Sequence, residues 1–331
     1  MSDQSHLSAA VILVTYNRAE NVRTCLDHVM RQTLPAAEIL VVDASPDDTT
    51  RVVVAEFPGV RYLRNDLGMG HMATSRAIGV GATDADIVVF IDDDAYAEPD
   101  WLEHLVVPYE DPDVGAVGGR ADNGIEGEEQ EGLESIGLLM EDGTLTGSFA
   151  ANPHRPVEVA HLLGANMSYR RSALTTIGGI HDHWPGTSLR EDADTGLRMT
   201  AAGYRVLFVP DAVVFHVGGK YAKGRRFDLR YSFYGARNHV VLLHHALGAS
   251  DPRTQRYRRA ALRSVRDQLS YAGQALRDRD RSPYRKARGF VNGVTRAGSI
   301  LAGTIAGYLA ARGVALGKEH LPHKEVTTEA K

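Results

Sequence analysis

The chain has 331 residues, 43% of them hydrophobic, and a net charge of −5 at pH 7. A chain of this length can bury one large α/β core with an appendage. Its only cysteine, Cys25, excludes an intrachain disulfide and fits a reducing compartment. A run of about eighteen uninterrupted apolar residues, which a membrane-spanning helix needs, does not occur. Residues 1–10 lack a basic region followed by an apolar run, so we expect no signal peptide and a cytoplasmic protein.

Charge divides the chain into two parts. Residues 243–331 carry 17 Lys and Arg against 7 Asp and Glu, a net charge of +10. Residues 1–242 carry 20 Lys and Arg against 35 Asp and Glu, a net charge of −15. We therefore expect an acidic, metal-using domain at 1–242 and a basic helical region at 243–331.

Strands and helices alternate through the first part of the chain. Apolar, mostly β-branched runs predict buried strands, and apolar residues at helical spacing predict the helices between them. This order is typical of a doubly wound, Rossmann-like, mostly parallel sheet flanked by helices. The expected strands are 9–18, which ends in a polar turn, 38–43, 60–64 and 85–91. The first expected helix has its N-cap at Asn17 and ends at about Gln32. Two further helices are expected around 52–57 and around 72–80.

The second half of the chain is less regular. Its glycine-rich and polar segments predict shorter elements separated by surface loops. We expect a strand at 114–119, an acidic loop at 122–135, a strand and turn at 162–171, a loop at 185–190, a helix at 191–202, strands at 204–209 and 212–215, and helices from Leu229 onward.

Three carboxylates, Asp92, Asp93 and Asp94, follow the buried strand at 85–91. In open α/β sheets, ligands bind at the carboxyl ends of the strands. Because side chains alternate along a strand, Asp92 and Asp94 share one face and Asp93 points away. Two carboxylates this close repel each other unless a cation lies between them, and hard oxygen ligands favour Mg²⁺ or Mn²⁺. The cluster predicts a divalent metal that holds a diphosphate; a solvated acidic turn is the alternative.

Five motifs, in this order, resemble those of family 2 glycosyltransferases with a GT-A fold. The resemblance covers roughly residues 9–240. It implies that a sugar is transferred from a nucleoside diphosphate sugar with inversion at the anomeric carbon. The motifs are Val14-Thr15-Tyr16-Asn17-Arg18, Val42-Asp43-Ala44-Ser45, Phe90-Ile91-Asp92-Asp93-Asp94, Gly164-Ala165-Asn166-Met167 and Glu191-Asp192.

For the nucleoside of the donor, the resemblance implies a site at the carboxyl ends of the strands. Thr15 and Tyr16 would border the nucleobase, with Asn17 in the same donor-binding turn. Asp43 would hydrogen-bond the base or its ribose; the alternative is an Asx turn that caps the following loop. Arg76 would reach the nucleotide, although the residue after it is not the asparagine usual in the family.

For the diphosphate, the resemblance implies a metal and an arginine. Asp92 would lie over the ribose, with Asp93 beside it in the donor site, and Asp94 would bind Mn²⁺ or Mg²⁺. His216 is a candidate further metal ligand, because some relatives use a histidine there; otherwise it is structural. Arg237 would face the diphosphate, since its guanidinium fork matches phosphate oxygens.

The pair Glu191-Asp192 is expected in the first turn of a helix, where the macrodipole keeps a carboxylate ionised. The resemblance places the catalytic base at Asp192, which would remove the proton of the acceptor hydroxyl. Glu191 would orient or bind the acceptor, and Trp184 would stack on a sugar face. The alternatives are ordinary acidic capping of the helix for the pair and a core position for Trp184.

The basic region begins with 12 Lys and Arg against 4 Asp and Glu between residues 251 and 290. Arg256, Arg259, Arg263 and Arg266 recur at helical spacing among apolar residues. Three roles stay open: peripheral contact with an anionic membrane at the inner face, packing on the domain, and a homodimer arm. Nucleic-acid binding is disfavoured because no recognised nucleic-acid module accompanies the charge.

Other functions were weighed against sugar transfer. A nucleotidyltransferase would need a glycine-rich basic loop after the first strand, where residues 15–20 contain no glycine. A processive polysaccharide synthase would need spanning helices and a Gln-x-x-Arg-Trp sequence. A non-catalytic sugar-nucleotide-binding protein would be marked by loss of Asp94 or Asp192, and both are present. The donor (UDP, dTDP or GDP type) and the acceptor (glycan, lipid-linked glycan or small natural product) are left open.

Overall fold

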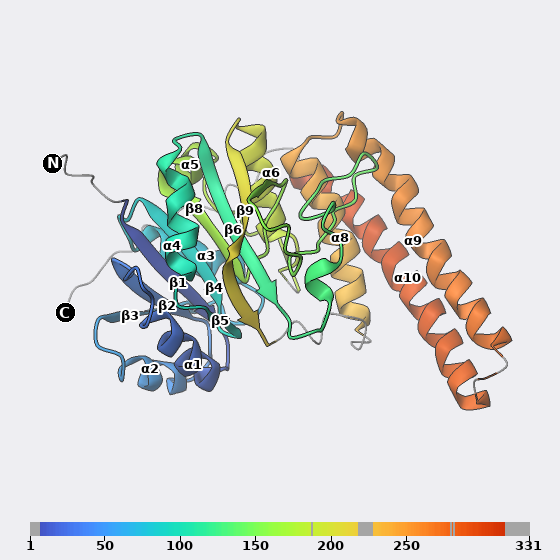
Figure 1. The fold of residues 1–331 in the computed structure, drawn as a ribbon. Helices are drawn as coiled ribbons and strands as arrows, with labels where there is room; N and C mark the ends of the chain where they lie inside the picture. The colour runs from blue at the N-terminus through green and yellow to red at the C-terminus, as the bar shows by residue number, and fades with distance from the viewer. Residues whose placement is uncertain (1–6, 187, 218–227, 279, 281, 315–331) are drawn as a thin grey trace.

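The computed structural model describes residues 7–186, 188–217, 228–278, 280 and 282–314 (Figure 1). In this part of the chain, one mixed sheet has the strand order β3-β2-β1-β4-β8-β6-β9-β5, and β7 pairs with β9. Helices cover the sheet, and the last helices extend away from it (Figure 1). The predicted α/β class with C-terminal helices is confirmed.

The first four strands form the expected parallel half of the sheet. β1 (Ala9–Thr15) pairs with β2 (Glu38–Asp43) and β4 (Ile87–Asp92), and β2 pairs with β3 (Val60–Arg64). The register sets Thr15 beside Asp43 and Val14 beside Asp92, so the carboxyl ends of these strands lie at one edge. The connecting helices are α1 (Ala19–Val29), α2 (Thr49–Val54) and α3 (Met72–Gly81).

The second half of the sheet contains both directions. β8 runs antiparallel to β4 and β6, β5 antiparallel to β9, and β6 parallel to β9. The two strands expected at 204–209 and 212–215 are one strand, β9, which contains Pro210. Its register against β6 shifts after Val209, so the proline sits at an irregularity where no ladder hydrogen bond is required of it.

The bounds of the elements in this half are β5 (Ala95–Ala97), α4 (Trp101–Val106), η1 (Val107–Glu110), β6 (Val114–Asp122), η2 (Glu128–Gln130), β7 (Val157–Glu158), β8 (Asn166–Arg170), α5 (Arg171–Thr176), α6 (Glu191–Ala201) and β9 (Arg205–His216).

The core lies on both faces of the sheet. Along β1 alternate residues enter opposite clusters, with Val11 and Leu13 on one face and Ile12 on the other, all fully buried. Burying each such side chain stabilises the fold by about 1.5–3 kcal/mol. A Cβ at Gly79 of α3 would lie 2.5 Å from Ile12, so a glycine is needed there for α3 to pack this closely on β1. The core therefore fixes the strand ends that carry the site.

The C-terminal helices are α8 (Leu229–Ala246), α9 (Pro252–Arg277) and α10 (Pro283–Val314). α8 runs across the boundary expected between residues 242 and 243, and α10 packs on it. A Cβ at Gly303 or Gly307 of α10 would lie 2.2 Å from the carbonyl oxygen of Phe233 or 2.6 Å from that of Arg237. These glycines let the two helix backbones approach closely. None of the described helices is long and apolar enough to cross a bilayer.

Candidate active site

Asp92, Asp94 and His216 come together at the carboxyl end of β4, with one ligand atom of each within 4.8 Å of the others. The pairing of β5 with β9 sets Ala95 beside His216, which brings the imidazole Nε2 to 3.5 Å from Asp94 Oδ1. Asp93 turns away, as the strand alternation predicted, and accepts a hydrogen bond of 2.7 Å from the Thr15 hydroxyl. Two carboxylates and one imidazole are a donor set that fits Mn²⁺ and, for the oxygens, Mg²⁺.

The three carboxyl groups differ in electrostatic environment. Burial raises the pKa of Asp92, although Arg76 acts against it. Burial also raises the pKa of Asp93, to about 6, against the Thr15 hydrogen bond and the Arg18 charge. Burial acts on Asp94 too, but the hydrogen bond from His216 and the Arg18 charge outweigh it and lower the pKa of Asp94. Asp94 is therefore the carboxyl group that stays ionised most readily.

Arg18 is a site residue to which the sequence assigned no role. Its Nη1 donates to Asp93 Oδ1 and to Asp94 Oδ2, at 2.9 Å in each case, and half of the side chain is exposed. Arg18 occupies the N-cap position of α1, where Asn17 had been expected, and Asn17 instead has a left-handed φ of 55°. The sequence signal that could have indicated this role is its position in the turn after β1, at the same sheet edge as Asp94.

Arg76 lies inside the protein rather than on the nucleotide surface. Its side chain is 1% exposed, and its Nη2 donates to Asp92 Oδ1 at 3.1 Å and to the Gly164 carbonyl at 3.0 Å. Its Nη1 forms an ion pair with Glu191, which is itself 3% exposed. The two residues pair in the interior and join β4 to α6, and contact of Arg76 with a nucleotide and of Glu191 with an acceptor remains a prediction.

Asp192 follows Glu191 and is the second residue of α6. Its Oδ2 accepts a hydrogen bond of 3.1 Å from the Gly164 amide, and the side chain is partly exposed. The Gly164 carbonyl accepts from Arg76, so one residue contacts both halves of the site. A Cβ at Gly164 would lie 2.9 Å from Arg76 Nη2, which explains the glycine. Three acidic residues in the first turn of α6 are favoured by the helix dipole.

The expected nucleoside contacts lie at the ends of β1 and β2. Asp43 is fully buried; its Oδ1 accepts from the Ser45 amide at 2.8 Å and its Oδ2 from the Tyr62 hydroxyl at 2.9 Å. This is the Asx turn that was the alternative for Asp43. Tyr16 is half-buried and Asn17 exposed beside it. Contact of these residues with a donor remains a prediction.

Two further expected site residues hold the loop that precedes α6. Trp184 is 1% exposed, packs in the core, and donates from Nε1 to the His181 carbonyl at 2.8 Å, so the core alternative describes it and stacking on a sugar does not. Arg237 of α8 donates to the His183 carbonyl at 2.8 Å, and burial lowers its pKa. Contact of Arg237 with a diphosphate remains a prediction.

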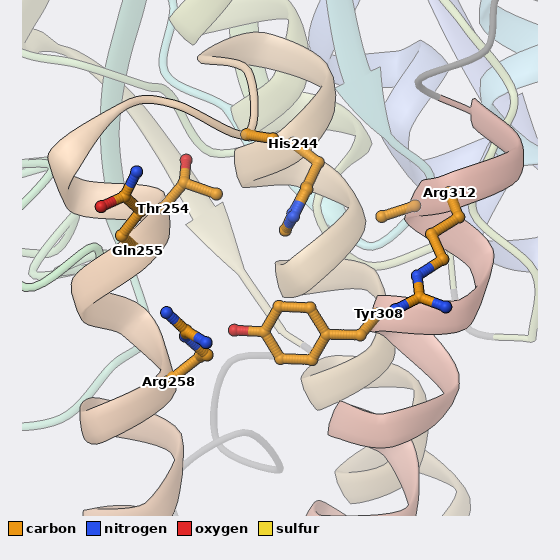
Figure 2. A pocket seen from close by; sticks show the side chains of 8 residues that line it. His244, Thr254, Gln255, Arg258, Tyr308 and Arg312 are labelled. Carbon is orange, nitrogen blue, oxygen red and sulfur yellow. The ribbon is translucent and has the colours of Figure 1, made fainter.

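A cavity of 480 Å³ lies among the C-terminal helices and shares no residue with the carboxylate cluster (Figure 2). The Tyr308 hydroxyl points across it toward Arg258 (Figure 2). Within the described residues, this buried hydroxyl has no hydrogen-bond partner. The lining residues come from α8, α9, α10 and the turn after α8: His244, Ala249, Thr254, Gln255, Arg258, Tyr308, Ala311 and Arg312.

Comparison with known proteins adds a family and two kinds of relatives. The family model described as glycosyl transferase family 2 matches residues 10–178, just over half of the chain. The O-antigen chain rhamnosyltransferase RfbN of Salmonella typhimurium is 25% identical over 63% of this chain and 66% of its own length. The glucosyl-dolichyl phosphate glucuronosyltransferase of Haloferax volcanii is 32% identical over 52% of this chain. The chain spans only 56% of the length of that second relative.

Two solved structures share the fold. A mannosyltransferase from Pyrobaculum calidifontis, in complex with GDP-Man and Mn²⁺, superposes with a TM-score of 0.60 at 19% identity. The superposition covers 92% of this chain and 88% of that one. GalNAc-T7 with UDP, GalNAc and Mn²⁺ has a TM-score of 0.55 at 15% identity and covers 80% of this chain and 51% of the other.

Proposed function

The chain belongs to glycosyl transferase family 2, and from that premise we propose that it is an inverting, metal-dependent glycosyltransferase. The donor is a nucleoside diphosphate sugar, and the acceptor offers a hydroxyl group on a glycan, a lipid-linked glycan or a small natural product. The observation that carries the proposal is a set of contacts: Arg76 pairs with Asp92 and Glu191 and donates to the Gly164 carbonyl, and the Gly164 amide donates to Asp192. These contacts join the carboxyl end of β4 to the start of α6.

Asp94, His216 and Asp92 are the residues that would hold a divalent cation. That cation would supply positive charge for the leaving diphosphate. Both structural neighbours are complexes with Mn²⁺ and a nucleotide or nucleotide sugar, which supports this choice of cofactor. Arg237 would add a second positive charge near the diphosphate.

Asp192 acts on the acceptor. One of its carboxylate oxygens takes the hydroxyl proton as the acceptor oxygen bonds to the anomeric carbon from the face opposite the diphosphate. The bond between that carbon and the diphosphate oxygen breaks in the same step, so configuration inverts. The Gly164 amide fixes Oδ2 of Asp192, which orients the carboxylate for this transfer.

The test is a thermal-shift screen of UDP, GDP, dTDP and their sugars, with and without Mn²⁺. A donor raises the unfolding midpoint by mass action, and it should do so only when the metal is present. Sugar transfer or donor hydrolysis by the same protein then separates an enzyme from a binding protein. Binding without turnover under any condition would contradict the proposal.

For the basic helices we propose contact with an anionic bilayer surface. α9 and α10 expose large apolar side chains, with Leu262 61%, Tyr284 72% and Leu309 63% exposed. Arg258 of α9 and Arg312 of α10, which line the cavity of Figure 2, add positive charge to the same two helices. Basic and apolar groups together are what an interfacial helix needs. We expect the full chain to float with phosphatidylglycerol vesicles but not with neutral vesicles. A protein that floats with neither kind of vesicle and forms a salt-insensitive dimer would contradict this role.

A further inference from the structure

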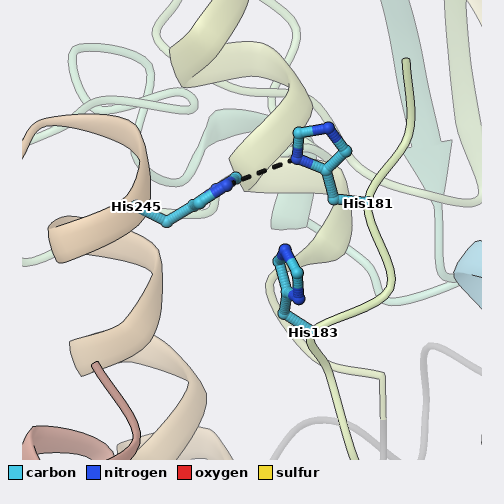
Figure 3. Close-up of side chains that lie close together, drawn as sticks. All are labelled: His181, His183 and His245. Carbon is cyan, nitrogen blue, oxygen red and sulfur yellow. Dashed lines mark hydrogen bonds between the residues drawn. The ribbon is translucent and has the colours of Figure 1, made fainter. Parts of the chain in front are cut away.

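Three histidines meet beside the active site, outside any role assigned so far. His181 and His183 lie on the loop between α5 and α6, and His245 lies near the end of α8 (Figure 3). One ring nitrogen of each lies within 4.8 Å of the others. The ring centroids are 5.1–5.7 Å apart.

The hydrogen bonds of two of these rings determine which nitrogen carries the proton. His245 Nδ1 is 2.6 Å from Asp194 Oδ1, and a carboxylate only accepts, so Nδ1 carries a proton and Nε2 is the nitrogen that faces the cluster. His181 Nε2 is 3.1 Å from the Gly178 carbonyl, so its proton is there and Nδ1 keeps its lone pair. His245 Nε2 and His181 Nδ1 face each other at 3.3 Å and form a hydrogen bond (Figure 3). A metal ion between these two nitrogens would replace this hydrogen bond.

His183 adds a third ring to this pair. One ring nitrogen of His183 points toward the other two rings (Figure 3). Neutral imidazole is a good ligand for Zn²⁺ and other late first-row metals, and three imidazoles are a common zinc set.

We propose that His181, His183 and His245 bind a divalent transition-metal ion of the Zn²⁺ class, with the fourth position open to water or another ligand. Asp194 is the outer partner: it is buried and ion-paired with Arg198 at 2.8 Å, and it fixes the His245 tautomer. The site shares no residue with Asp92, Asp94 and His216, and its all-nitrogen donors prefer a softer metal than those carboxylates.

The loop that carries two of the ligands is already held in place by other contacts. Asp182, between them, accepts hydrogen bonds from the Thr74 hydroxyl at 2.6 Å and from His71 at 3.2 Å. The metal therefore orders little additional chain when it binds. It would fasten this loop to α8 and, through Asp194, to the first turn of α6, two residues from Asp192.

The test uses the full chain and Co²⁺ as a spectroscopic substitute for Zn²⁺. Tetrahedral Co²⁺ with nitrogen ligands absorbs visible light much more strongly than six-coordinate Co²⁺ with oxygen ligands. We expect an intense visible band at one Co²⁺ per chain, which Zn²⁺ abolishes by displacement. His181→Gln, His183→Gln and His245→Gln should each weaken Zn²⁺ binding by about 100-fold or more, since even outer-partner losses cost about 10–100-fold.

Two matched variants assign the signal. Asp94→Ala should keep the band, and His104→Gln, on α4 with a partly exposed ring, should bind Zn²⁺ like the wild type. A weak band in the wild type, a band that survives His183→Gln and His245→Gln, or a band lost in Asp94→Ala would overturn the proposal. Circular dichroism checks that each variant is folded; if His245→Gln is not, His183→Gln on the loop decides alone.

Discussion

The two histidine-containing clusters are built differently. Asp92, Asp94 and His216 lie at the ends of β4 and β9, so sheet register fixes their spacing, and their carboxylate oxygens favour a hard cation. His181, His183 and His245 lie on a loop and a helix, and their donors are all nitrogen. On the proposed assignments the two clusters would select different metals by donor type, and the sheet edge and the loop can be disrupted separately.

The largest effect is expected from Asp94→Ala. This variant removes an oxygen donor and one of the two acceptors of Arg18, so metal-dependent nucleotide binding should fall below detection. Arg18 is half exposed, so loss of its pair with Asp94 should cost the fold about 1 kcal/mol or less. Calorimetric titration of nucleotide with Mn²⁺ measures the binding, and the Co²⁺ band of the histidine cluster should persist as the control. Unchanged nucleotide affinity would remove Asp94 from the metal site.

Asp192→Asn breaks the chemistry without disturbing either cluster. The Asn side-chain oxygen can still accept from the Gly164 amide, but it cannot take a proton. We expect kcat for transfer to fall by about 10²–10⁴-fold, with donor affinity changed only a few-fold. Steady-state kinetics measure the change in kcat, and NMR of the wild-type product gives its anomeric configuration. Transfer at a near wild-type rate would point to another base, and a product with retained configuration would exclude single displacement.

Arg76→Met tests whether the interior bridge holds the sheet edge. Removing the guanidinium leaves Glu191 and Asp92 without their cation, so the free energy of unfolding should fall by about 3–5 kcal/mol. Glu191→Gln in the same chain should recover part of this loss, because it removes the unpaired buried charge. Urea unfolding measures each step. The matched control is Arg23→Met, which breaks a partly exposed pair with Glu56 and should lower the free energy of unfolding far less than Arg76→Met.

The sheet edge was predictable from sequence because it depends on local rules. Strand alternation separates Asp93 from Asp92 and Asp94, and parallel order brings β1, β2 and β4 to one edge. The predicted break between the strands at 204–209 and 212–215 was wrong: β9 is continuous, and Pro210 is tolerated in it because it lies at a shift in register.

The rest depends on contacts between distant segments. Whether Arg76 points outward or inward depends on how α3 is rotated on β1, which Gly79 decides by its close approach to Ile12. Trp184 is in the core because a long loop folds back onto α6 and α8. His181 and His245 are 64 positions apart, and no local pattern relates them.

The smallest effect is expected from His239, a buried histidine outside the three-histidine cluster. Unlike two of those rings, which hydrogen-bond each other, it hydrogen-bonds a backbone carbonyl. Its Nε2 donates to the Gly143 carbonyl at 2.7 Å, and its ring stacks on Tyr257 at 4.3 Å between centroids. Burial, with the charge of Arg190, lowers its pKa to about 3, against the opposing charge of Asp142. The unfolded chain takes up a proton near pH 6.5 and the folded chain does not, so stability is lost as pH falls from about 6.5 toward 3.

At pH 5 this one residue should cost the fold about 2 kcal/mol relative to pH 7. His239→Gln can keep a donor to the Gly143 carbonyl but does not titrate, so its free energy of unfolding should fall by about 2 kcal/mol less over the same interval. His161, whose pKa burial also lowers, is present in both proteins and cancels in the difference. Urea unfolding of both proteins at pH 7 and pH 5, in EDTA so that no metal binds the three-histidine cluster, measures it. Parallel pH profiles would show that His239 is protonated in the folded protein or that its hydrogen bond to Gly143 is not formed.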